Sequence, residues 1–171
     1  MTRWLFGDQL GPGFHGDGDV FLAISLAHLG RRRWHRQKIH LVLSAMRHLA
    51  ASLGDRATLV VAPTYRAAMA EAGLRPEDLT VAEPTSRAAD AFVRRLGVTV
   101  VRNDGFATHR DDFAGWARDR GSKRLLLEDF YRWQRIRHGV LVEPDGEPTG
   151  GRWNFDADNR EAPPRGATTL G

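Results

Sequence analysis

The chain has 171 residues, 42% of them hydrophobic, which predicts one domain with a sizeable core and argues against general disorder. Lys and Arg number 25 against 21 Asp and Glu, a modest basic excess that permits an anionic ligand or nucleic acid without requiring either. The absence of cysteine excludes disulfides, cysteine nucleophiles, thiolate zinc sites and cysteine-held iron–sulfur clusters within these residues. No signal-peptide pattern or membrane-spanning apolar run is present, so we expect a cytoplasmic protein with no membrane partner.

Short apolar runs alternate with helical patterns along the chain, a layout typical of a parallel sheet covered on both faces. We expect strands at residues 3–6, 20–25, 58–62, 79–82 and 98–101. We expect helices at residues 34–53, 65–71, 86–96, 111–119 and 128–138. Gly54 is expected to end the first of these helices, and Ser86 to cap the third. The predicted fold class is α/β, a Rossmann-like doubly wound five-stranded parallel sheet with helices on both faces and an irregular C-terminal strap.

Ligands of such sheets lie outside the carboxyl ends of the strands, where the strand order reverses. This directs attention to "GDQL" after the first strand, "AEPTS" after the fourth and "RNDGF" after the fifth. Gly7 allows close approach of a ligand, and the Asp8 carboxylate can accept from a ring N–H or a hydroxyl. A tight turn with Asp8 as its cap explains the same residues, and both interpretations stay open. Dinucleotide and P-loop glycine patterns are absent.

Two basic segments each have two interpretations. The run "RRRWHRQK" stands at the start of a helix, where cations oppose the helix dipole. Arg36 and Lys38 could bind an anion there, although such a run is more commonly a solvated face. In "EDFYRWQRIRH" the aromatic and arginine side chains could stack bases and hold phosphates, but a core stripe is favoured. No histidine spacing indicates a metal site and no nucleophile elbow is present, so no metal and no catalytic residue are predicted.

Six segments in order resemble the amino-terminal part of the deoxyribodipyrimidine photolyase-related proteins, which are iron–sulfur bacterial cryptochromes and (6-4) photolyases. They are "FGDQL", "QKIHLVLSAMRHL", "AEP", "RNDGF", "EDFYRWQR" and "GGRWNFDADNR", and the similarity covers residues 4–164. The resemblance implies a Rossmann-like domain that binds an antenna chromophore, a ribityl lumazine where one is known. It also implies a larger helical domain that binds FAD, holds a four-cysteine cluster and receives the DNA lesion.

The resemblance assigns roles to particular residues. Chromophore or ligand binding is assigned to Gly7, Asp8, Gln9, His28, Val42 and Gly105. Structural motif positions are Arg47, Glu128, Tyr131, Arg132, Trp153, Asn154, Asp156 and Arg160. The chain departs from the family after the second strand, where "AISLAHLGRRR" replaces an acidic segment and His28 stands in place of an acidic contact. A family pair of histidines is reduced to Trp34 and His35.

These assignments divide the chain into an antenna-type domain at 1–138, a strap or linker at 139–164 and a disordered tail at 165–171. We expect a stand-alone or truncated photolyase-like domain that holds a lumazine-like or nucleotide-like ligand. The chain has no room for FAD or an iron–sulfur cluster, so it is not expected to act as a lyase alone, and DNA would be contacted weakly or indirectly. The alternative is an interaction domain without a ligand that docks to a separately encoded flavin domain. Trp153 and Phe155 are expected to be buried against the Rossmann-like body, whereas Trp153 would be exposed if it packs against the flavin domain.

Overall fold

The computed structural model describes residues 1–156, and these residues belong to two compact units. The first unit is Met1–His109, and the second begins at Arg110. The boundary lies inside the span 1–138 that the sequence predicts as one domain. The two units are therefore described separately.

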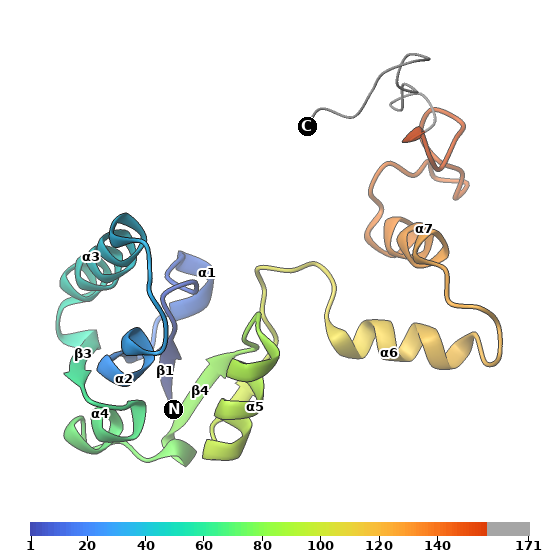
Figure 1. The fold of residues 1–171 in the computed structure, drawn as a ribbon. Coiled ribbons are helices and arrows are strands. Elements are labelled where there is room, and N and C mark those ends of the chain that lie inside the picture. The colour runs from blue at the N-terminus through green and yellow to red at the C-terminus, as the bar shows by residue number, and fades with distance from the viewer. Residues whose placement is uncertain (157–171) are drawn as a thin grey trace, which may run out of the picture. The chain divides into compact units, whose positions relative to one another are not determined.

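The first unit contains a five-stranded sheet in which all paired strands are parallel (Figure 1). Its strands are β1 (Thr2–Leu5), β2 (Val20–Ser25), β3 (Ala57–Ala62), β4 (Leu79–Ala82) and β5 (Thr99–Val101). Their order in the sheet is β3-β2-β1-β4-β5, so the order reverses between β1 and β4. This confirms the predicted fold class, and it places the ligand crevice of such folds beside the ends of β1 and β4.

Five helices connect the strands of the first unit. They are α1 (Pro12–His15), α2 (Leu26–Gly30), α3 (Arg36–Leu53), α4 (Tyr65–Glu71) and α5 (Arg87–Leu96), with 3₁₀ turns at Gly54–Arg56 and Pro76–Asp78. The three longest helices confirm the predictions, including the end of α3 at Gly54, whose φ is 58°. The Ser86 hydroxyl caps α5 by accepting from the Ala89 N–H at 3.2 Å. Helices α1 and α2 were not predicted, because four or five residues are too few to show a helical period.

The two faces of the sheet carry separate hydrophobic clusters. Trp4 and its register partner Phe21 pack with residues of α4 and α5. The next pair, Leu5 and Leu22, packs with Met46 of α3. Since successive side chains of a strand point to opposite faces, the two neighbouring pairs account for helices on both sides.

The second unit contains α6 (Arg110–Asp119) and α7 (Leu127–His138), both of which the sequence predicts. Four aromatic rings join these helices. Phe130 lies 5.1 Å from Phe113, 4.9 Å from Trp116 and 5.6 Å from Trp133, measured between ring centroids. The preferred interpretation of the aromatics in this segment, a core stripe, agrees with these contacts.

The residues after α7 are arranged around a buried arginine. Arg135 is 6% exposed, and its guanidinium donates to the carbonyl oxygens of Val140, Leu141 and Trp153. It also lies 5.0 Å from the centroid of the half-buried Trp153 ring. Phe155 is 41% exposed, so the expectation that both aromatics are buried is wrong for Phe155.

The physical reason is that the two rings have different partners. Trp153 lies against the buried Arg135, whereas Phe155 lies against the turn at Gly150, where an added Cβ would be 3.5 Å from Phe155 Cζ, with the Arg152 guanidinium carbon 4.6 Å from its ring centroid. Arg160, the end of the predicted strap and the tail at 165–171 lie outside the described residues.

Candidate functional site

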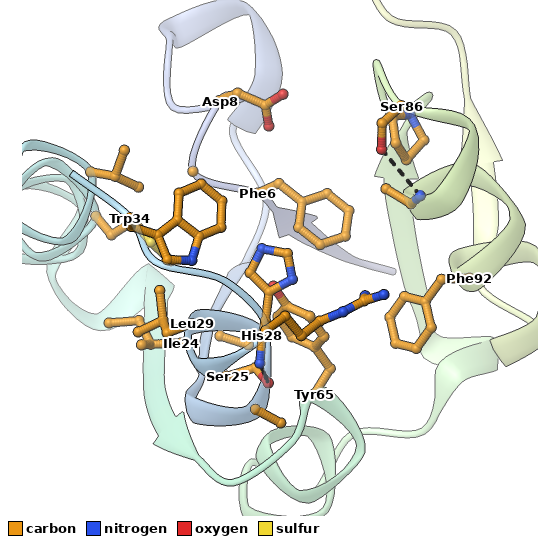
Figure 2. Close-up of a pocket in the computed structure, with 18 of the residues that line it drawn as sticks. Phe6, Asp8, Ile24, Ser25, His28, Leu29, Trp34, Tyr65, Ser86 and Phe92 are labelled. Carbon is orange, nitrogen blue, oxygen red and sulfur yellow. Dashed lines mark hydrogen bonds between the residues drawn. The ribbon is translucent and has the colours of Figure 1, made fainter. Parts of the chain in front are cut away.

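A cavity of about 860 Å³ lies in the first unit at the carboxyl ends of β1, β2 and β4 (Figure 2). Its walls come from the loop after β1, the end of β2 with α2, the first half of α3, the start of α4, and the loop that leads from β4 into α5. This is where the strand order reverses, and two of the three candidate loops, those after β1 and β4, line the cavity. Its volume falls within the range of small-molecule sites.

Aromatic rings line the cavity in a continuous row. The His28 ring lies between Trp34 and Tyr65 in Figure 2, with 5.8 Å between ring centroids on either side. The Tyr65 ring then lies 6.0 Å from Phe6 and 5.7 Å from Phe92. Such a wall presents the faces and edges of several rings, which suits a flat ligand.

A polar pair stands beside this wall. Asp8 Oδ2 accepts from the Thr85 hydroxyl at 3.1 Å, which links the loops after β1 and β4. The backbone turn around Asp8 is closed separately, by the Gln9 N–H donating to the Phe6 carbonyl at 2.9 Å. Burial, together with the Asp8 carboxylate, raises the pKa of Tyr65 to about 12, so its hydroxyl remains a donor at neutral pH. The site therefore offers a carboxylate acceptor and a phenol donor.

Cationic side chains also line the cavity. The Arg32 guanidinium carbon lies 3.8 Å from the Trp34 ring centroid, and Lys38 Nζ lies 5.8 Å from the same centroid. Burial lowers the pKa of His28, and the charges of Arg31 and Arg32 lower it further, so the imidazole is neutral at neutral pH.

The structure brings together only some of the predicted ligand residues. Gly7, Asp8, His28 and Val42 line the cavity, as does Lys38. A Cβ added to Gly7 would lie 2.5 Å from Val42 Cγ1, so this glycine allows α3 to pack closely against the end of β1.

Three predicted residues lie outside the cavity lining, namely Gln9, Arg36 and Gly105. Gln9 is 1% exposed and donates to the Ala82 carbonyl at 2.9 Å, so it joins the ends of β1 and β4. Arg36 is an exposed residue at the start of α3. A Cβ on Gly105 would lie 3.1 Å from Phe14 Cζ, which places this glycine against the α1 side of the fold. Gln9 and Gly105 therefore hold together the loops at the carboxyl ends of the strands and do not face the cavity.

The predicted structural residues divide between the units. Arg47 is exposed on α3 and forms no ion pair within residues 1–156. Glu128 and Arg132 pair along α7 at 2.5 Å, and Tyr131 is 49% exposed beside them. Two other predicted structural residues, Asn154 and Asp156, lie after α7, where Asn154 Oδ1 accepts from the Asp156 N–H at 2.7 Å.

Sequence reasoning missed Tyr65 and Phe92 of the cavity wall, and it named the loop of Thr85 without singling out that residue. Tyr65 follows β3, so the same rule about strand ends could have found it. Phe92 lies one turn inside α5, and no sequence signal pointed to it. Asn103 lies in the candidate loop after β5 but was not singled out: it is 3% exposed and donates to the Glu83 carbonyl at 2.9 Å, joining the loops after β4 and β5.

The described residues contain neither a metal-binding cluster nor a membrane-spanning helix. No group of three or more His, Cys, Asp or Glu side chains in residues 1–156 is placed to hold a metal ion. Within the same residues, no helix combines the length and the apolar character that crossing a bilayer requires.

Comparison with known proteins agrees with the resemblance of the motifs. Residues 3–170 match the family described as Deoxyribodipyrimidine photo-lyase-related protein. The chain belongs to this family. It is also 33% identical, over 181 aligned positions, to a (6-4) photolyase of Agrobacterium fabrum (strain C58 / ATCC 33970). The match covers 92% of this chain and 35% of that relative, so the photolyase-related chain spans about a third of the relative's length.

Proposed function

We propose that this photolyase-related chain binds a planar antenna chromophore of the ribityl lumazine type in the cavity at the ends of β1, β2 and β4. The observation that carries the proposal is the row of rings from Trp34 through His28 to Tyr65, beside the hydrogen-bonding groups of Asp8 and Tyr65. A pteridine ring can stack on such a wall, and its ribityl hydroxyls can donate to a carboxylate.

The bound chromophore would serve light-driven DNA repair or light sensing by passing excitation to a flavin. Support comes from the family and from the relative described as a (6-4) photolyase. FAD and the iron–sulfur cluster would be held outside these 171 residues, which contain no cysteine to ligate a cluster. DNA would then contact this chain weakly or indirectly.

The test is titration of the purified chain with 6,7-dimethyl-8-ribityllumazine, followed by the chromophore's fluorescence anisotropy. Asp8→Ala should weaken binding by about 1–3 kcal/mol, because a charge-assisted hydrogen bond is lost. Asp17→Ala is the matched control, since Asp17 is an exposed carboxylate outside the cavity lining and should leave the affinity unchanged.

Each result discriminates between interpretations. Equal affinity of the Asp8→Ala variant and the parent would move the ligand away from the end of β1. No binding by the parent would reject the antenna function and favour the interpretation as a docking domain without a ligand.

A further inference from the structure

The charges that line the cavity are unbalanced. Four cationic side chains, Arg31, Arg32, Lys38 and Arg66, line it together with one carboxylate, Asp8. Within residues 1–156 none of these four cations forms an ion pair, and the carboxylate is hydrogen-bonded to Thr85. A concave site with low-dielectric walls concentrates this positive potential.

Two of the cations lie against one ring. The Arg32 guanidinium carbon and Lys38 Nζ lie 3.8 Å and 5.8 Å from the centroid of Trp34, which ends the aromatic row. Arg32 precedes α3 and Lys38 lies in its first turn, whereas Asp8 is bonded to the loop after β4. A ligand stacked along the row would thus meet cations at Trp34 and a carboxylate acceptor at Asp8.

The Trp34 ring contacts two of these cations but does not neutralise their charge. Positive charge at the start of a helix opposes the helix dipole, and α3 has no acidic residue in its first turn to compensate. A ribityl lumazine without a phosphate offers hydroxyl groups but no anion to balance these charges. A phosphate monoester offers two negative charges and three acceptor oxygens, which guanidinium and ammonium groups bind well.

We propose that the natural ligand of this cavity carries a phosphate monoester on its sugar-like arm, and that Arg32 and Lys38 bind this phosphate. The proposal rests on the proposed function, because it concerns the same cavity and the same flat ring. It assigns the basic run around the start of α3 to ligand recognition. Arg32 and Lys38 would bind the phosphate, whereas Arg33 and Arg36 do not line the cavity.

The experiment compares two ligands that differ only in the phosphate: 6,7-dimethyl-8-ribityllumazine and its 5′-phosphate. Both are titrated into the full chain at low and at physiological salt. The phosphorylated ligand should bind at least about tenfold more tightly at low salt, and the advantage should shrink as salt is added. The double variant Arg32→Gln/Lys38→Gln should lose this preference and bind the two ligands with equal affinity.

The matched control is Arg33→Gln/Arg36→Gln, which removes the same charge from the same run outside the cavity lining and should keep the preference. Circular dichroism verifies that both double variants keep the helical content of the parent. Equal affinity of the parent for the two ligands would overturn the phosphate proposal and leave the proposed function standing. An equal loss of preference in both double variants would also overturn it, since the effect would then be one of net charge. Failure of the parent to bind either ligand would reject the proposed function itself, and the phosphate proposal with it.

Discussion

Substitution of Gly7 by alanine tests how closely α3 packs against the end of β1. The added Cβ would lie 2.5 Å from Val42 Cγ1, whereas non-bonded carbons are most stable at about 3.5–4.0 Å, so the helix or the Val42 side chain must move by roughly 1 Å. Overpacking of this kind costs about 1–3 kcal/mol. The assay is native-state amide hydrogen exchange of β1 and β2, because it reports the unfolding free energy of the first unit without a contribution from the second.

Two further variants make this prediction specific. Gly18→Ala is the control, because a Cβ there meets no atom within 4 Å and should change stability by less than about 0.5 kcal/mol. In a Val42→Ala background the methyl group added at position 7 gains space, so Gly7→Ala should cost less there, with a coupling energy of about 0.5–3 kcal/mol. The packing argument would be refuted by the same cost in both backgrounds, or by no cost in the parent.

Two more predictions concern charged groups. Burial and, after it, the charges of Arg31 and Arg32 lower the pKa of His28 below its ordinary value of 6.5, so the unfolded chain binds a proton at this residue more readily than the folded chain does. The contribution of neutral His28 to stability is therefore complete above pH 6.5 and declines as the pH falls toward the folded pKa. Hydrogen exchange at several pH values should show the decline, and His28→Gln should reduce it. The substitution Arg135→Met should leave three carbonyl groups after α7 without their donor and should expose the Trp153 ring. Iodide should then quench tryptophan fluorescence more strongly than in the parent, and unchanged quenching would contradict the role of Arg135.

The regular elements could be predicted because each has a strong local signal. The apolar run of β2, all six residues of which are buried, and the long apolar stripe of α3 carry their periods in the sequence. The position of the cavity also followed, since it depends only on strand order and on which loops leave the carboxyl ends of the strands. Short helices lack such a period, which is why α2 was missed. The exposure of Phe155 was wrong because the contacts of Trp153 with Arg135 and of Phe155 with Arg152 depend on the folded path after α7 and leave no local pattern.

The cavity wall was less predictable than its position. Its ring contacts join residues distant in sequence, such as Trp34, Tyr65 and Phe92, and these depend on the placement of three helices relative to the sheet. The match to the family's motifs did not distinguish residues that face the cavity from residues that hold its walls in place. Gly7 illustrates the difficulty, because the same glycine borders the cavity and permits the contact with Val42.

The end of β1 shows how support and recognition are divided between adjacent residues. Gln9 is buried and donates to the Ala82 carbonyl, so it fixes the loop after β1 to the end of β4, where the strand order reverses. Its neighbour Asp8 is exposed to the cavity and reaches Thr85 across the same crevice. Since the buried amide already joins the two loops, the carboxylate can exchange its bond to Thr85 for one to a ligand without separating them.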